Sequence, residues 1–174
     1  MQHSVFLLLG SNLGDRERNL LMACSGISKS IGTILKISSV YETEPWGFED
    51  NSPFYNQALE AETALSPEEL LQEIHRIEKR LGRVRQEPEC SSGSVCSSTV
   101  YSSRTIDVDI LFYDSRILFT EELMIPHPRL HERRFTLVPL NEIAPAFMHP
   151  VYRKPVSDLL LMCNDKGGVK RISL

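Results

Sequence analysis

Hydrophobic and polar positions along the chain follow two periods, which predicts a mixture of strands and helices. Apolar runs or two-residue alternation, typical of strands, occupy 4–9, 33–41, 55–63 and 106–113. Apolar residues at helical spacing occupy two further segments, one before Gly32 and one before Gly82. The order is therefore strand, helix, strand, strand, helix, strand. It predicts an α+β fold with a ferredoxin-like βαββαβ core, in which an antiparallel sheet carries two helices on one face.

The ends of both helices carry local signals. Asp15 is suited to cap the first helix and Gly32 to end it. The second helix starts at residues 66–69, a Ser-Pro-Glu-Glu capping box with proline at the first helical position, and Gly82 closes it. We therefore expect two helices with well-defined ends.

The rest of the chain contains one unusual loop and a C-terminal extension. Residues 86–103 include seven serines, one glycine and one proline with almost no apolar periodicity, so we expect an extended flexible loop. No internal repeat is present, and we expect residues 1–174 to form a single domain. In the extension we expect short helical pieces around 129–134 and 137–143, a helix at 156–163 and a closing strand at 169–174.

Composition narrows the class of protein. Hydrophobic residues make up 41% of the 174 positions and charged residues 24%, which is ordinary for a globular chain that folds around its own core. The formal net charge of −4 offers no basic excess for nucleic-acid binding. No apolar run approaches the roughly 20 residues that span a bilayer, and the first residues lack the pattern of a signal peptide. We therefore expect no nucleic-acid or membrane partner, a cytoplasmic location, and a monomer or weak homodimer.

Two carboxylates stand out on the last predicted strand. Asp107 and Asp109 project to the same side of a strand, with Cα atoms roughly 6–7 Å apart, while Ile106, Val108 and Ile110 point into the core. Aspartate is disfavoured inside strands, and adjacent carboxylates repel each other unless a cation lies between them. Because Mg²⁺ prefers a few carboxylates plus substrate phosphates, the pair indicates a magnesium site. From this short motif alone, a solvent-facing strand with two inert aspartates is an equal or better explanation.

Basic residues near this strand favour the metal explanation. Arg83 and Arg85 lie just past a predicted helix end, and Arg104 stands three residues before Asp107. Arginine forks match phosphate oxygens, although arginines at a helix C-terminus also complement the helix dipole. Together with a carboxylate pair, these cations predict a polyphosphate site. Further cations follow at His127, Arg129, Arg133 and Arg134.

Aromatic and amide side chains give a weaker signal. Phe54 and Asn56 follow a long loop, and Phe135 follows the arginine-rich segment. Two rings are able to clamp a flat heterocycle while an asparagine amide bonds its edge. The residues alone favour the alternative, in which both rings are core residues and Asn56 satisfies loop backbone groups.

Taken in order, these motifs resemble the 6-hydroxymethyl-7,8-dihydropterin pyrophosphokinase family of folate biosynthesis. The most specific stretch is 125–135, which reads IPHPRLHERRF. The resemblance implies a ferredoxin-like enzyme that transfers pyrophosphate from ATP to 6-hydroxymethyl-7,8-dihydropterin and releases AMP. The other matching stretches are 8–14, 39–45, 55–58, 76–78, 82–85, 104–111 and 142–145.

The resemblance also implies roles for single residues. Asp107 and Asp109 would hold two Mg²⁺ ions that bridge the triphosphate of the co-substrate ATP, and together with the nearest arginines they would form the catalytic set. That set would be Arg83, Arg85, Arg104, Asp107 and Asp109. The pterin pocket would consist of Thr43, Trp46, Phe54, Asn56 and Phe135. The nucleotide would be bordered by His75, Glu78, Ile110, His127 and Arg133.

One segment departs from the family pattern. Members usually carry Trp-Gly-Pro-Arg before the metal strand, whereas this chain has Tyr-Ser-Ser-Arg at 101–104 after a longer loop. We therefore expect slower or weaker closure of this loop over substrates, without loss of activity. The altered loop leaves an alternative open: a non-catalytic pterin- or nucleotide-binding protein. A structural domain without any ligand is disfavoured by the basic residues around Asp107 and Asp109.

Overall fold

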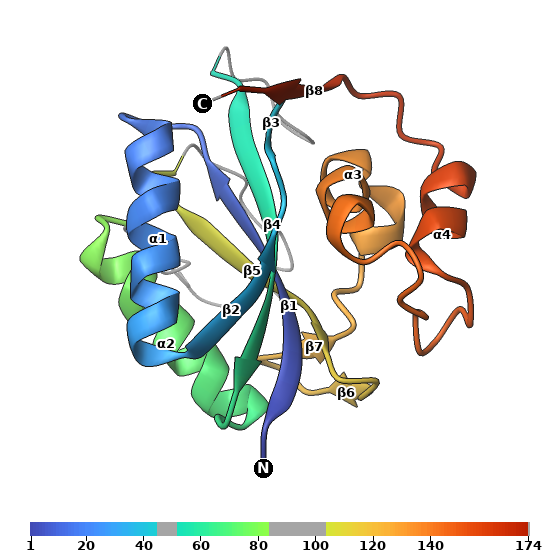
Figure 1. Ribbon diagram of the computed structural model, residues 1–174, viewed down its shortest axis with the longest axis horizontal. Coiled ribbons are helices and arrows are strands. Elements are labelled where there is room, and N and C mark those ends of the chain that lie inside the picture. The colour runs from blue at the N-terminus through green and yellow to red at the C-terminus, as the bar shows by residue number, and fades with distance from the viewer. Residues whose placement is uncertain (45–51, 84–103, 174) are drawn as a thin grey trace, which may run out of the picture.

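The computed structural model describes residues 1–44, 52–83 and 104–173 (Figure 1). Its centre is one sheet in the order β5-β1-β4-β3-β8, with β2 pairing to a further part of β4, and every pairing is antiparallel. The antiparallel sheet expected from the sequence is therefore confirmed. The strands of this sheet are β1 (His3–Ser11), β2 (Gly32–Ile37), β3 (Val40–Thr43), β4 (Phe54–Thr63), β5 (Asp107–Tyr113) and β8 (Val169–Ile172).

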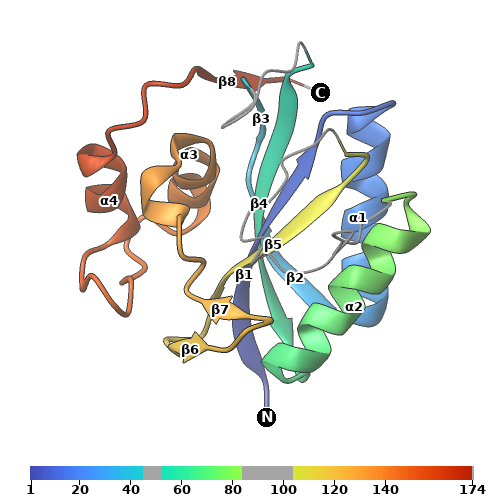
Figure 2. The ribbon, with the colours of Figure 1, turned by 180° about the vertical axis from the view of Figure 1, so that it is seen from behind.

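Two helices connect the strands that run parallel to each other. β1 and β2 both run antiparallel to β4, so α1 (Arg16–Ser30) crosses between parallel strands. In the same way, α2 (Pro67–Arg80) connects β4 to β5, which both run antiparallel to β1. Parallel strands need a crossover of this kind because no tight turn joins them. Both helices lie on one face of the sheet, as Figures 1 and 2 show from opposite sides.

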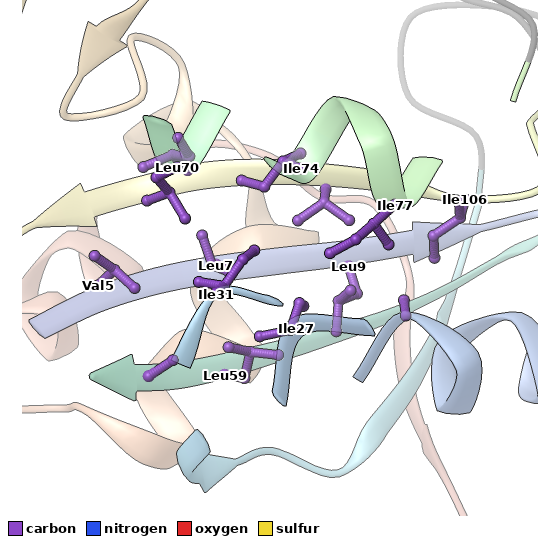
Figure 3. Close-up of a cluster of buried hydrophobic side chains, with 14 of the residues drawn as sticks. Val5, Leu7, Leu9, Ile27, Ile31, Leu59, Leu70, Ile74, Ile77 and Ile106 are labelled. Atoms are coloured by element: carbon purple, nitrogen blue, oxygen red, sulfur yellow. The ribbon is translucent and has the colours of Figure 1, made fainter. Parts of the chain in front are cut away.

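The main core lies between these helices and the sheet. The apolar stripe of α2, formed by Leu70, Ile74 and Ile77, packs with Leu7 and Leu9 of β1, all at most 2% exposed (Figure 3). The spacing of the stripe places three side chains on one helix face, and the alternation of β1 places two on one sheet face. Burial of these side chains is the main force that fixes both helices to the sheet.

The predicted helix ends are confirmed with one difference. Asp15 caps α1 by accepting from the Arg18 backbone N–H, and the capping box of α2 forms as expected. Gly82 follows α2 with φ of +86°, a conformation that suits glycine. Gly32 does not end α1 by such a turn but begins β2. A Cβ there would lie 2.0 Å from the Glu62 carbonyl oxygen, so the glycine is required by the close approach of β4.

The single strand predicted at 33–41 is wrong in one respect, because it is divided into β2 and β3. Ile37 pairs with Leu59, whereas Tyr41 pairs with Asn56, so the β2–β3 segment contains one residue more than the part of β4 that it faces. Ser38 takes up this irregularity: its N–H donates to the Ala58 carbonyl, and its hydroxyl accepts from the Ala58 N–H. The strand was predicted from its richness in β-branched residues, which suits both strands and does not mark the position of an extra residue.

The C-terminal extension covers the opposite face of the sheet (Figures 1 and 2). It forms a second cluster in which Leu137 and Leu140 of α3 pack against Phe6, Leu8 and Phe112 of the sheet. The predicted last helix and closing strand are confirmed. The two-residue strands were not expected, because two residues show no alternation. The elements of the extension are β6 (Leu118–Phe119), β7 (Met124–Ile125), η1 (Leu130–Glu132), α3 (Arg134–Ile143) and α4 (Val156–Met162).

Two further expectations from the sequence concern the long loop and the absence of a membrane-spanning segment. The loop predicted at 86–103 lies outside the described residues. Among the helices of the described ranges, none combines the length and apolar character that crossing a bilayer requires.

Candidate active site

A pocket lies between the sheet and α3, on the face opposite α1 and α2. Residues from four strands and one helix line it, so it depends on the complete fold rather than on one loop. Its lining combines two rings, two arginines and a carboxylate pair. The lining residues are Leu8, Gly10, Thr43, Glu44, Phe54, Asn56, Arg104, Asp107, Asp109, Arg133 and Phe135.

The two aspartates share the pocket side of β5, as the alternation predicts. Val108 and Ile110 are each 5% exposed and belong to the main core, whereas Asp107 and Asp109 line the pocket. Opposite Asp107 on β1 stands Gly10, where an added Cβ would lie 3.2 Å from the Asn56 side-chain oxygen. A larger residue at position 10 would therefore crowd the floor of the pocket between the carboxylates and Asn56.

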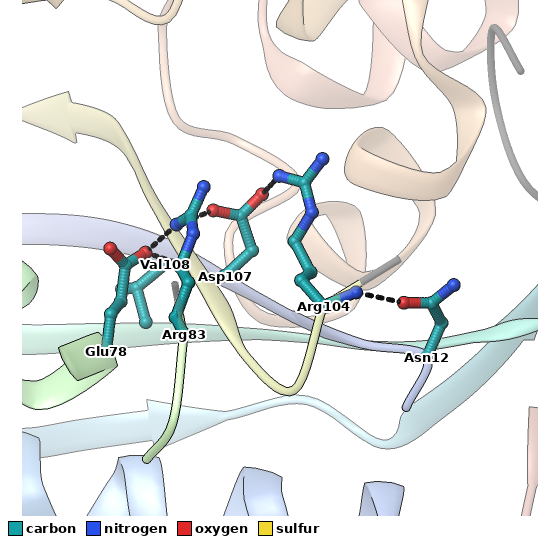
Figure 4. Close-up of polar contacts among 6 residues, drawn as sticks. All are labelled: Asn12, Glu78, Arg83, Arg104, Asp107 and Val108. Atoms are coloured by element: carbon teal, nitrogen blue, oxygen red, sulfur yellow. Dashed lines mark hydrogen bonds and ion pairs between the residues drawn. The ribbon is translucent and has the colours of Figure 1, made fainter. Parts of the chain in front are cut away.

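Arginines neutralise Asp107 from both sides. The guanidinium of Arg83 donates to one carboxylate oxygen of Asp107 and to Glu78, and Arg104 donates to the other oxygen of Asp107 (Figure 4). The side chains of Arg83, Arg104 and Asp107 are only 16–20% exposed. Partly buried ion pairs of this kind are screened less by solvent than surface pairs.

Glu78 connects the helix layer to this charged group. It lies in the last turn of α2, is 1% exposed, and accepts from the Val108 backbone N–H at 3.0 Å. Val108 stands between the two aspartates, so Glu78 contacts their strand from behind while it also binds Arg83. A buried carboxylate requires such partners, and here they fix the position of β5 relative to α2.

Asp109 is the more perturbed of the two carboxylates. Burial, reinforced by the negative charge of Asp107, raises the pKa of Asp109 to about 7, and Arg133, Arg104 and Arg83 oppose this shift. Burial is the largest cause and the Asp107 carboxylate adds to it, so ionisation of Asp109 is disfavoured even with three arginines nearby. A cation bound beside Asp109 would favour its ionised form.

The carboxylate pair fits Mg²⁺ only if a ligand completes the coordination. Within the described ranges, no three His, Cys, Asp or Glu side chains gather so as to hold a metal by themselves. Mg²⁺ is commonly held by one or two carboxylates together with substrate phosphates and water. Asp107 and Asp109 on one pocket wall match that donor set, and the arginines at Asp107 occupy part of the space where a cation would act.

The pocket lining also includes two aromatic side chains and one amide side chain. Asn56 is 3% exposed and donates through its side-chain nitrogen to the Thr43 hydroxyl at 2.7 Å, not to loop backbone. Phe54 and Phe135 both line the pocket, and the Arg133 guanidinium carbon lies 5.6 Å from the centre of the Phe135 ring. The rings therefore have surface available to a ligand, and the core-only explanation of these residues is not favoured.

The residues expected around a nucleotide differ in where the structure places them. Arg133 lines the pocket directly. The His127 backbone N–H donates to the Leu111 carbonyl, next to the bulge of β5, and burial with the charge of Arg133 lowers the His127 pKa to about 4. His75 is half-buried on α2, one turn before Glu78. The Ile110 side chain is in the core, so a ligand contact is left to its backbone groups.

Two expected site residues, Trp46 and Arg85, lie outside the described residues. One positioning residue was missed by sequence reasoning, which interpreted the loop after β1 only as a turn. The Asn12 backbone N–H donates to the Arg104 carbonyl, and the Asn12 side-chain oxygen accepts from the Arg104 N–H at 2.7 Å (Figure 4). Its only sequence signal was an asparagine inside a glycine-flanked loop. This double contact fixes the Arg104 backbone just before the chain enters β5.

Comparison with known proteins locates the chain among pterin-processing enzymes. A sequence model of the family described as 7,8-dihydro-6-hydroxymethylpterin-pyrophosphokinase (HPPK) matches residues 6–145. A 2-amino-4-hydroxy-6-hydroxymethyldihydropteridine pyrophosphokinase from Aquifex aeolicus is 41% identical over 155 residues, which cover 89% of each chain. One of the same name from Bacillus subtilis is 41% identical over 144 residues, covering 82% of this chain and 79% of that protein.

Solved structures agree at the level of the fold. A Plasmodium falciparum HPPK-DHPS with pteroate superposes with a TM-score of 0.70 at 18% identity, covering 93% of this chain and 42% of the other. An HPPK-DHPS in complex with substrates gives 0.70 at 15% identity, covering 92% and 43%. The family match runs from β1 through every described pocket residue to the end of α3, and the two relatives are similar over most of both chains. The chain therefore belongs to the 7,8-dihydro-6-hydroxymethylpterin-pyrophosphokinase family.

Proposed function

We infer that the chain catalyses transfer of pyrophosphate from ATP to 6-hydroxymethyl-7,8-dihydropterin, with release of AMP, in folate biosynthesis. The family match and the names of the relatives carry this activity. The structural observation that supports it most strongly is the composition of one pocket: a carboxylate pair, arginines and two aromatic rings line the same cavity. A polyphosphate and a flat heterocycle would each find a suitable wall there.

We propose that Asp107 and Asp109 would hold two Mg²⁺ ions at the phosphates of ATP. When bound, these ions would neutralise charge on the phosphate oxygens. The support is the shared orientation of the carboxylates and the raised pKa of Asp109. Asp107 would exchange its arginine partners for a cation, and the guanidinium groups of Arg83 and Arg104 would then face phosphate oxygens, which their fork geometry suits. Arg85 would join them by resemblance to the family.

The pterin would lie between Phe54 and Phe135. Stacked rings hold a flat heterocycle by dispersion and by the match of ring quadrupoles. The Asn56 amide would bond the polar edge of the pterin, and its contact with Thr43 fixes its orientation beforehand. Trp46 would complete this wall by resemblance. In this arrangement water would be excluded from both faces of the pterin ring, and the hydroxymethyl group would point toward the carboxylates.

The nucleotide would be bordered by His75, Glu78, Ile110, His127 and Arg133. The lowered pKa of His127 keeps its imidazole uncharged at neutral pH, so it would contact phosphate or base as a hydrogen-bonding group rather than as a cation. Arg133 would supply positive charge from the α3 side of the pocket. Glu78 is already engaged with Arg83 and Val108, so we assign it to the support of the phosphate wall.

Transfer in this pocket would depend on alignment and charge neutralisation. Phosphoryl-type transfer needs the attacking oxygen in line with the phosphorus and the charge on equatorial oxygens stabilised, and little covalent help. The ring clamp would place the attacking hydroxyl, and the arginines would stabilise charge on the transferred group.

We extend the proposal to the architecture and setting of the enzyme. The sheet order and the two crossovers support a ferredoxin-like βαββαβ core with the C-terminal extension closing the pocket face. We propose that residues 1–174 act as one domain, because the pocket takes residues from β1 through α3. A monomer or weak homodimer and a cytoplasmic location stay predictions from the sequence.

A product assay tests the function directly. Purified protein is given ATP, Mg²⁺ and 6-hydroxymethyl-7,8-dihydropterin, and nucleotides are separated chromatographically. The proposal predicts AMP formed in equal amount to pterin diphosphate and dependent on both pterin and Mg²⁺. Formation of ADP would mean ordinary phosphoryl transfer and would overturn it, and pterin binding without AMP would favour a non-catalytic binding protein.

A further inference from the structure

Arg16 is a charged residue at an unexpected place. It is the first residue of α1, and its side chain is only 25% exposed. A cation in the first helical turn opposes the helix dipole, which favours acidic residues such as its neighbour Glu17. The position of Arg16 therefore needs an explanation outside its own helix.

Three contacts from the pocket-forming strands supply that explanation. The Arg16 guanidinium donates to the Pro53 backbone carbonyl at 2.7 Å. Its central carbon lies 3.7 Å from the centre of the Tyr55 ring, a close cation–π contact. A nitrogen of the same group lies 3.6 Å from a Glu42 carboxylate oxygen. One guanidinium thus connects the start of α1 to both β3 and β4.

These contacts surround Phe54 without touching the pocket. Pro53 and Tyr55 are its immediate neighbours in the chain, and Glu42 pairs with Tyr55 across the sheet. Successive residues of a strand face opposite sides, so Tyr55 points toward α1 while Phe54 lines the pocket. Arg16 therefore holds the backbone on both sides of Phe54 from behind the sheet.

Phe54 needs such support because it lies at an end of the sheet. It is the first residue of β4, and its pairing with Thr43 is the last of the β3–β4 ladder. The ladder between β1 and β4 ends at Tyr55, one residue further into β4. Strand ends with one neighbour fray more readily than strand centres. The ring that would stack on the pterin is thus attached at a weakly paired position.

We propose that Arg16 is a positioning residue that sets the Phe54 wall of the pocket and so controls pterin affinity. The proposal rests on the proposed function, in which Phe54 stacks on the pterin. Arg16 is not among the residues that line the pocket, and the carboxylate pair lies on β5, which none of the three contacts of Arg16 described above involves. Its removal therefore loosens the pterin wall and leaves the phosphate wall in place.

The test measures two dissociation constants for each of four proteins. The proteins are wild type, Arg16→Ala, Arg16→Lys and the matched control Arg18→Ala, which removes an exposed arginine from the same helix turn. Each is titrated calorimetrically with pterin in the presence of Mg²⁺ and a non-hydrolysable ATP analogue. In a separate experiment, each is titrated with that analogue alone. Arg16→Ala is expected to raise the pterin Kd roughly tenfold, the scale of one lost hydrogen bond to a charged donor, and to leave the nucleotide Kd within about twofold. Arg18→Ala is expected to match wild type.

Arg16→Lys keeps the charge beside Glu42 but lacks a planar fork that both stacks on Tyr55 and reaches Pro53, so it is expected to give an intermediate pterin Kd. If Arg16→Ala does not fold, Arg16→Lys alone decides, and a wild-type pterin Kd in Arg16→Lys overturns the proposal. An unchanged pterin Kd in Arg16→Ala, or an equal rise of both constants, also overturns it.

Phe54→Ala separates the inference from the function on which it rests. If Phe54→Ala weakens pterin binding and Arg16→Ala does not, only the role of Arg16 fails. If neither variant weakens pterin binding while AMP is still formed, the pterin does not use this wall, and the role of Arg16 fails together with that part of the proposed function.

Discussion

On the face covered by α1 and α2, the sheet buries Val108 and Ile110 among aliphatic side chains, whereas on the face toward α3 the same strand presents Asp107 and Asp109 to a pocket. The first face is held by non-directional burial, which tolerates many apolar residues as long as volume is kept. Around the pocket, the other face is held in part by directed contacts between charged groups, such as those of Arg83 and Arg104 with Asp107. The core-facing side chains of β5 therefore contribute to stability, and its pocket-facing side chains contribute to the proposed activity. Changes on the core face should alter the free energy of unfolding, and changes on the pocket face should alter substrate binding and turnover.

The largest expected effect comes from neutralising the pocket face. In the double variant Asp107→Asn with Asp109→Asn, AMP formation should fall roughly 1000-fold or more, because the phosphates lose the ions that offset their charge. Folding should persist, since the core face of β5 is unchanged. Steady-state kinetics with saturating Mg²⁺ checks this, and Glu17→Gln, an exposed change on α1, is the matched control and should keep wild-type turnover.

A change on the core face should lower stability and leave substrate binding nearly unchanged. Ile74 is fully buried between α2 and β1, so Ile74→Ala should lower the free energy of unfolding by about 2–5 kcal/mol. Urea unfolding measures this loss. At a temperature where the variant is folded, its KM values for ATP and pterin should stay close to wild type, and a selective rise in either KM would show that the two faces are not separable.

Glu78 connects the two faces, and its substitution should affect both measurements moderately. Glu78→Gln keeps an acceptor for the Val108 N–H but removes the charge that binds Arg83. The free energy of unfolding should fall by about 1–3 kcal/mol, because a buried guanidinium loses one of its counterions. Turnover should also fall, and a stability loss without any kinetic effect would remove Glu78 from the support of the phosphate wall.

The smallest expected effect is a pH dependence in the C-terminal extension. Burial, with the charge of His131, lowers the pKa of His149 to about 4, and its ring accepts from the Val151 and Tyr152 backbone N–H groups. The unfolded chain takes up this proton near pH 6.5, so stability is present above that pH and is lost as pH falls toward 4.

Urea unfolding at pH 7 and pH 5 measures the effect. The loss attributable to His149 should be on the order of 1–2 kcal/mol at pH 5, and His149→Asn, which keeps a side-chain acceptor, should remove that part of the pH dependence. The same pH dependence in wild type and variant would contradict the assignment.

The difference between the faces also explains what the sequence could predict. Helices α1 and α2, the capping box at 66–69 and the shared orientation of Asp107 and Asp109 follow from local periodicity, and all are confirmed. The division of 33–41 into β2 and β3 depends on one extra residue opposite β4, and β6 and β7 are too short to show a period.

Within the site, residue types alone indicated the charged groups but not their partners. The contacts of Asn12 with Arg104 and of Arg16 with Pro53 join residues that are distant in sequence, so no local pattern encodes them. Phe54 and Phe135 illustrate the same limit, because a phenylalanine side chain suits both a buried core and the wall of a ligand pocket. Only the resemblance to the family singled them out, and their role with pterin stays a proposal.

We propose that Asp107 and Asp109 gather divalent cations around the phosphates of ATP. Calorimetric titration of a non-hydrolysable ATP analogue, with and without Mg²⁺, tests this role in wild type and in the double asparagine variant without depending on turnover. We expect Mg²⁺ to strengthen binding to wild type at least tenfold and to have little effect on binding to the variant. An equal strengthening by Mg²⁺ in both proteins would contradict it.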